Sequence, residues 1–420
     1  MYSFTYPKFI IKKYLKYRTF KNIGFLTIGQ GLSQIISLIG AFYIPSLLGL
    51  ENYGIYNTVI AYVGMFTVLT FSGLNKVIIR EAAKDTSRTQ EILEATIGLR
   101  ILFSILATFI AIITVYFVSY DFGTKIYIII YSFSLLFKGA ESSINTVFQA
   151  NQKMKILGIM ATVKQIILVS LSILFLWLGF GVLYIIILHL SVEAFVALIL
   201  WYQSKKIIVF RFFSKIKIIS KYIVSGFRFS LLEFFNVLSG KVDLVMLSFL
   251  TTPENVAIYS LAYRLVDKGL VLRTPISQSL FPYYSEKFLG SAPKIKELIK
   301  HTLLITIPLL VFLLPAIFLI KPIINNIIGK EFIESAKIFS VLVFYLIFNF
   351  SVIPWGLTLQ TTSNEKYNLY TVFLLAIINI SLNIIFFNIY GIIGIAYSTL
   401  LVEASRLILL FTYTKKYVIQ

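Results

Sequence analysis

Cysteine is absent from this chain of 420 residues, and histidine occurs only as His189 and His301. The absence of cysteine excludes disulfide bonds, thiolate-bound metals and cysteine nucleophiles. Two histidines are too few for a histidine metal site unless carboxylates complete it. The sequence therefore predicts no metal site and no bound cofactor.

Charged residues are also scarce, at 13% of the chain, whereas soluble domains carry about a quarter. Hydrophobic residues make up 58%, and the mean hydropathy is +0.87. Apolar runs of about 17–25 residues or slightly more, the length of a membrane-spanning helix, recur from end to end. They are continuous and lack the alternation of barrel strands, so they indicate helices. We predict an all-α integral membrane protein.

About twelve such runs can be placed, and the loops between them are short except around residues 204–221. No soluble catalytic domain fits into loops of this size, so we expect a protein that is not an enzyme. The predicted spans are 22–50, 55–75, 97–119, 125–150, 156–179, 182–203, 222–250, 255–283, 301–321, 335–362, 367–389 and 391–413.

The net charge of +20 would suggest a nucleic-acid partner in a soluble protein, but a membrane protein offers a simpler reason. Lysine and arginine collect in cytoplasmic loops. With the spans above, 27 basic residues fall on the side of the two termini and only four on the other side. We therefore expect both termini in the cytoplasm, contact with anionic membrane lipid and no nucleic acid. The stretches Phe9–Lys21 and Ile207–Ile223 mix aromatic and basic residues, which is typical of segments on the inner leaflet.

A short repeat divides the chain into two halves. Residues 51–56, ENYGIY, close the first span, and residues 254–259, ENVAIY, close the seventh, 203 residues later. The same offset relates the starts of other spans. Six spans are an even number, so both halves enter the membrane from one side, related by a pseudo-two-fold along its normal. The predicted parts are a cytoplasmic tail 1–21, a six-helix bundle 22–203, a basic linker 204–221, a second bundle 222–413 and a tail 414–420.

Polar residues mark one face of the first helix in each half. In span seven, Glu233, Asn236 and Asp243 follow helical spacing and share a face. In span one, Gln30 and Gln34 lie one turn apart, and Gln30 is the repeat counterpart of Glu233. We expect the two stripes to face a central cavity, with the carboxylates as candidates for ion coupling.

Seven basic and six acidic residues fall within the predicted spans, and two interpretations remain open. The charges can pair locally at i,i+3, as Lys138–Glu141, Arg264–Asp267 and Glu403–Arg406 would. Alternatively, they line a water-filled cavity and bind an anion such as a phosphate or pyrophosphate. The candidate substrate-binding cations are Arg264, Lys268, Lys241, Arg273 and Lys138.

Several short motifs give the chain a resemblance to a known family. They are residues 44–49 with 51–56, 72–74 with 80–83, 241–247 with 256–265, and 328–332. Together they resemble the polysaccharide and O-antigen flippases of the multidrug/oligosaccharidyl-lipid/polysaccharide exporter superfamily. The resemblance implies a MATE-like, V-shaped transporter of twelve helices in the bacterial inner membrane. It also implies transport of an undecaprenyl-pyrophosphate-linked oligosaccharide (an O-antigen, capsule or exopolysaccharide repeat unit), coupling to protons or sodium ions, and a polysaccharide polymerase and a chain-length regulator as partners.

Two other functions compete with this interpretation. A cation-coupled multidrug antiporter of the same fold would use unpaired carboxylates, whereas basic residues are conspicuous here. A polysaccharide polymerase is an enzyme with a similar number of spans. It would need a large external loop, and the external loops here are short.

Overall fold

The computed structural model of the chain is helical throughout the residues that it describes. These are residues 8–70, 75, 78, 89–151, 153–205, 207, 230, 231, 234, 235, 237, 240–288, 293–362 and 364–419. Most of the predicted linker 204–221 and the first part of predicted span seven lie outside them.

The helices of the first half follow the predicted spans with shifts at several ends, and the largest differences are at two places. The first helix begins at Lys8 rather than near residue 22, so the predicted tail from Lys8 onward continues into the first span instead of forming a separate segment. The predicted fourth span is broken at Phe133 into two helices. The elements are α1 (Lys8–Leu48), α2 (Leu50–Phe66), η1 (Thr67–Thr70), α4 (Thr89–Val115), α5 (Phe122–Ser132), α6 (Ser134–Ala150), α7 (Met154–Trp177) and α8 (Val182–Ser204).

The second half is broken more often. The predicted eighth span consists of two helices, and the predicted tenth span is likewise divided between Ser351 and Ile353. The elements are α10 (Pro253–Leu270), α11 (Arg273–Lys287), α12 (Ile295–Ile323), η3 (Ile324–Ile328), η4 (Lys330–Phe332), α13 (Ser335–Ser351), α14 (Ile353–Thr361), α15 (Glu365–Tyr390), α16 (Ile392–Thr414) and η5 (Lys415–Ile419).

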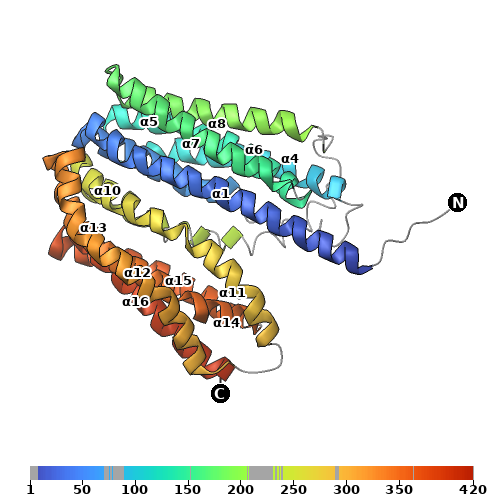
Figure 1. Ribbon diagram of the computed structural model, residues 1–420. Coiled ribbons are helices and arrows are strands. Elements are labelled where there is room, and N and C mark those ends of the chain that lie inside the picture. The colour runs from blue at the N-terminus through green and yellow to red at the C-terminus, as the bar shows by residue number, and fades with distance from the viewer. Residues whose placement is uncertain are drawn as a thin grey trace.

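The helices form two groups that meet at one end and spread apart toward the other (Figure 1). The first group contains α4 to α8 with α1 packed along α7, and the second contains α11 to α16 with α10 packed along α13. Between the groups, α2 packs on α10 and the end of α1 packs on η3. The start of α1 and the end of α16 both lie toward the spread end (Figure 1).

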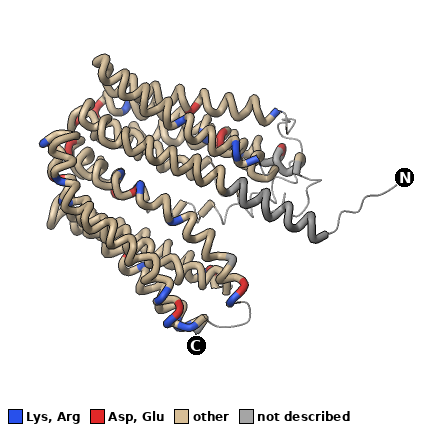
Figure 2. The backbone as a smooth tube through the Cα atoms, viewed as in Figure 1, with Lys and Arg blue, Asp and Glu red and all other residues tan. Residues whose placement is uncertain are grey.

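The described part of the chain contains nine helical stretches long and apolar enough to cross a membrane. The number is below twelve partly because predicted span four is divided and α10 carries several charges. Charged residues lie at many helix ends, and a smaller number lie part way along helices of both groups (Figure 2). Phe312 and Phe318 on α12 are 80% and 79% exposed, which is expected of side chains in contact with lipid tails.

Glycines permit the closest helix contacts. A Cβ added to Gly54 in α2 would lie 1.8 Å from the carbonyl oxygen of Pro253, the first residue of α10. A Cβ on Gly29 in α1 would lie 2.4 Å from the carbonyl oxygen of Gly158 in α7. Small residues at such crossings let backbones approach, which is a common way of packing helices in membranes. One contact joins the two halves, and the other fixes α1 within its own half.

Candidate functional site

Helix α10 lies at the junction of the two halves, where it packs on α2, and it carries several charges. It begins at Pro253, whose fixed φ suits the first turn of a helix. Arg264 and Lys268 are separated by one turn and therefore share a face, with Asp267 beside them. Because α10 packs directly on α2, this face is directed toward the first half of the chain.

Arg264 reaches across to α2. Its Nη2 atom donates a hydrogen bond of 2.8 Å to the Oδ1 atom of Asn57. The guanidinium carbon also lies 5.6 Å from the ring centroids of both Tyr53 and Tyr56. A cation over aromatic faces gains favourable electrostatic energy, more so when water is excluded. The predicted local pair with Asp267 is replaced by these contacts with the other half, so that prediction was wrong.

Lys268 makes a second contact between the halves. Its Nζ atom donates a hydrogen bond of 2.6 Å to the Oγ atom of Ser37 in α1. Ser37, Asn57, Arg264 and Lys268 line a cavity of 260 Å³ between the halves. The two cations therefore hold first-half groups and at the same time form part of the wall of a polar cavity.

A larger cavity of 770 Å³ lies among the helices of the second half. Its charged lining consists of Lys241, Asp267, Arg273, Glu403 and Arg406. Lys241 and Asp267 also line the smaller cavity, as does Tyr263, so the two cavities adjoin along these side chains. Lys241 and Arg273 were predicted to line a cavity, and here they do so together with Arg406. Arg406 also pairs with Glu403 at 3.3 Å, as the sequence predicted.

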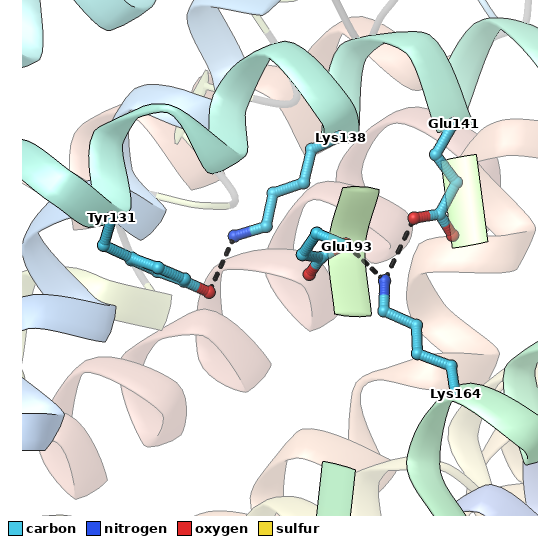
Figure 3. A network of polar contacts seen from close by, with 5 residues as sticks. All are labelled: Tyr131, Lys138, Glu141, Lys164 and Glu193. Carbon is cyan, nitrogen blue, oxygen red and sulfur yellow. Dashed lines mark hydrogen bonds and ion pairs between the residues drawn. The ribbon is translucent and has the colours of Figure 1, made fainter. Parts of the chain in front are cut away.

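The candidate Lys138 lies elsewhere, in a cluster inside the first half (Figure 3). Its Nζ atom donates a hydrogen bond of 3.2 Å to the Tyr131 hydroxyl, and the ammonium lies 4.7 Å from the centroid of that ring. Glu141 pairs instead with Lys164 at 3.0 Å, and Lys164 also pairs with Glu193 at 2.5 Å. The predicted Lys138–Glu141 pair is therefore wrong.

Asp243 does not line either cavity. Its carboxylate is 2% exposed and accepts three hydrogen bonds from uncharged donors. The donors are the Tyr259 hydroxyl at 3.1 Å, the Thr399 hydroxyl at 2.7 Å and the Asn383 amide at 2.8 Å. Among the described residues no lysine or arginine pairs with it. The three hydrogen bonds therefore offset the free-energy cost of burying this carboxylate.

Of the remaining candidates that the structure describes, Gln30 and Gln34 do not line either cavity. Gln30 is exposed on α1, and Gln34 is half-buried, with an Oε1 atom that has no hydrogen-bond partner in the described chain. Glu233 and Asn236 lie outside the described residues. Sequence reasoning overlooked Asn349, a single amide in an apolar run, which lines the larger cavity and donates a hydrogen bond of 3.0 Å to Glu403. A polar residue within a span is itself the signal that could have identified it.

Structural comparison shows that the chain shares its fold with solved membrane transporters. It is similar to a structure described as lipid II flippase MurJ in an inward closed conformation, with a TM-score of 0.76, 18% identity and coverage of 93% of this chain and 87% of that one. It also resembles a multidrug resistance MATE family transporter of the MOP superfamily in two states. The inward-facing structure gives a TM-score of 0.69 at 12% identity, covering 91% of this chain and 94% of that one. The outward-facing structure gives a TM-score of 0.65 at 14% identity, covering 95% of this chain and 94% of that one.

The fold is therefore that of MurJ and of the MATE transporters, in an all-α protein that passes through the membrane several times. Residues 19–288 match the Polysaccharide biosynthesis protein family, and the chain belongs to that family. No curated protein matches the chain in sequence.

Proposed function

We propose that this protein is a flippase that moves a polyprenyl-pyrophosphate-linked oligosaccharide across the bacterial inner membrane by alternating access. The observation that carries the proposal is the pair Arg264 and Lys268 on the wall of a cavity between the two halves. Cations in a site shielded from water are suited to a diphosphate, with arginine binding it through a planar fork. Membership of a polysaccharide biosynthesis family supports an oligosaccharide as the group attached to that diphosphate.

The proposal includes two six-helix halves related by a pseudo-two-fold, with both termini in the cytoplasm. Side-chain contacts near the repeated motif support the symmetry. The Asn52 amide donates a hydrogen bond of 3.3 Å to the Leu48 carbonyl, and the Asn255 amide donates one of 2.6 Å to the Thr251 hydroxyl. Residues 48 and 251, like 52 and 255, are 203 positions apart, so the same pair of positions is hydrogen-bonded in both halves, through a backbone acceptor in the first and a side-chain acceptor in the second.

Movement of the halves would change what the two cations bind. The hydrogen bonds from Arg264 to Asn57 and from Lys268 to Ser37 both cross from one half to the other. When the halves separate here, these donors lose their partners and become available to a diphosphate. A ligand that binds one conformation better than another shifts the equilibrium between them by that difference in affinity.

Asp243 is the proposed site of ion coupling. Its carboxylate, the Thr399 hydroxyl and the Asn383 amide come from different helices, so protonation or binding of a sodium ion would change contacts among them. Oxygen donors of this kind suit a hard cation. The multidrug antiporter remains the second candidate, because this carboxylate lacks a basic partner among the described residues.

The test replaces Arg264 and Lys268 separately by alanine in cells that depend on this protein for surface polysaccharide. We expect each variant to enter the membrane at normal levels while surface polymer is lost, because a charge-assisted contact contributes about 1.5–3 kcal/mol, or roughly tenfold to a hundredfold in binding. Lys300→Ala, at an exposed position on α12, is the control and should have no effect. Normal polymer in both variants would remove these residues from the site. Export of cationic drugs without any effect on polymer would favour the antiporter.

A further inference from the structure

Three residues on the wall of the larger cavity carry polar atoms that the described part of the protein does not satisfy. In the described chain, Nε of Arg406, Oδ1 of Asn349 and Oδ1 of Asn368 are buried without a hydrogen-bond partner. All three residues line the 770 Å³ cavity, and they come from α16, α13 and α15. A buried polar atom without a partner costs about 1–3 kcal/mol, so such atoms usually serve a ligand or water. Their convergence from three helices indicates a binding site.

The charges of this cavity favour an anion. Lys241, Arg273 and Arg406 exceed Asp267 and Glu403 by one positive charge on its wall. Glu403 is already engaged, because its Oε1 atom accepts hydrogen bonds from both Arg406 and Asn349. Arg273 forms no ion pair with any residue that the structure describes. The guanidinium fork matches a planar carboxylate, which it can bind with two parallel hydrogen bonds.

The rest of the lining suits a sugar. Gln278, Gln360 and Asn368 offer amide donors and acceptors to hydroxyl groups. The rings of Tyr263 and Tyr345 offer apolar faces with a polar end, which suit the C–H face of a pyranose. A volume of 770 Å³ lies within the range of about 300–1,000 Å³ typical of small-ligand sites.

The position of α1 indicates that the diphosphate binds in the smaller cavity and not in the larger one. Ile28, Ile35 and Ile39 on α1 are 63%, 62% and 46% exposed, which marks a lipid-facing surface. Ser37 of the same helix contacts Lys268 in the smaller cavity. A diphosphate joined to a lipid tail is therefore best placed in the smaller cavity, beside α1. The attached head can then extend past Lys241, Tyr263 and Asp267 into the larger one.

We propose that the larger cavity recognises an acidic sugar in the transported head, with Arg273 and Arg406 binding its carboxylate and Asn349 and Asn368 binding its hydroxyl groups. This inference rests on the proposed flippase function and adds a substrate class to it: lipid-linked oligosaccharides that contain a uronic acid or a similar carboxylate-bearing sugar.

A binding experiment tests the cavity without transport. The full chain in detergent is titrated with a soluble glucuronic acid–glucose disaccharide and with its glucose–glucose counterpart, and binding is measured by calorimetry. We expect the acidic sugar to bind more tightly, and Arg273→Gln, which breaks no ion pair, to weaken it by about tenfold to a hundredfold. Asn368→Leu should weaken both sugars, and Lys300→Gln neither. Equal binding of the two sugars by the native chain, or an unchanged preference in Arg273→Gln, overturns the proposal.

A transport experiment separates this proposal from the flippase function. Vesicles containing the protein receive the same two disaccharides linked to undecaprenyl pyrophosphate, and flipping is followed by access of an external reagent to the sugar. Arg273→Gln and Arg406→Lys should slow the acidic lipid and spare the neutral one, whereas Arg264→Ala should slow both. If Arg273→Gln slows both equally, the cavity binds the diphosphate and the acidic-sugar proposal fails. If native protein flips neither lipid while the binding preference holds, the sugar site stands and the flippase function fails.

Discussion

Replacing Gly54 by alanine tests whether the contact between α2 and α10 holds the two halves together. The added Cβ would lie 1.8 Å from the Pro253 carbonyl oxygen and 2.4 Å from its carbonyl carbon. Both are backbone atoms, so no change of rotamer can relieve the clash. Overpacking of this kind costs about 1–3 kcal/mol. The clash exists only while α2 and α10 are in contact. The variant should therefore shift the equilibrium constant toward a conformation in which the two helices are separated, by a factor of about 5 to 150.

Spin labels can measure this shift directly, because the chain has no cysteine that would need to be removed. Labels on Glu51→Cys and Thr252→Cys, both exposed positions beside the contact, report the separation of α2 and α10. We expect Gly54→Ala to add a population with a longer distance. Gly64→Ala is the matched control, since it lies in the same helix and its added Cβ would meet nothing within 4 Å. Identical distance distributions in both variants and in the native chain would refute the reasoning.

Three further predictions concern stability, each read from thermal melting of the purified protein in detergent. Lys164→Met leaves the buried Glu193 and the half-buried Glu141 without their cation, and we expect a loss of about 3–5 kcal/mol that changing both glutamates to glutamine largely restores. Gly158→Ala would place a Cβ 2.5 Å from a carbonyl oxygen of α1, and we expect about 1–3 kcal/mol of destabilisation, more than in Gly64→Ala. Burial raises the pKa of the Asp121 carboxyl, but hydrogen bonds from Thr124 and neighbouring backbone groups lower the pKa by more, to below its ordinary value. Its stabilising contribution is therefore complete above about pH 4 and lost as the pH falls through the folded pKa, and Asp121→Asn should flatten that acid-side decline.

The sequence predicted the helices well because each depends on a property of neighbouring residues. Apolar runs of membrane length predict spans whatever surrounds them. The breaks between helices were harder to predict, because nothing in the composition near Phe133 distinguishes two helices from one. The start of α1 was also hard to predict, since the helix begins earlier than the hydropathy indicates. The local pattern thus gives the existence of an element more reliably than its ends.

Charge partners were hard to predict for a different reason. The i,i+3 rule finds neighbours on one helix, and it was right for Glu403 and Arg406. Lys164 instead binds carboxylates from α6 and α8, which are 23 and 29 residues away. Likewise Asp243 shares a helix face with cavity residues, but its carboxylate accepts hydrogen bonds from Tyr259 and Thr399. Helical spacing predicts the direction of a side chain, but it does not predict which neighbouring helix lies in that direction. Such contacts require knowledge of how the helices pack.

The charged cluster of the first half also differs from the cavity walls of the second half in how its charges are balanced. Inside the first half, Lys138 and Lys164 are matched in number by Glu141 and Glu193, so that cluster is electrically neutral (Figure 3). The second half contributes all five cations of the cavity walls and only two carboxylates. If the chain is the flippase proposed above, an anionic passenger would be attracted to the second half and would move with it. Its release would then depend on changes within that half rather than on a symmetrical loosening of both.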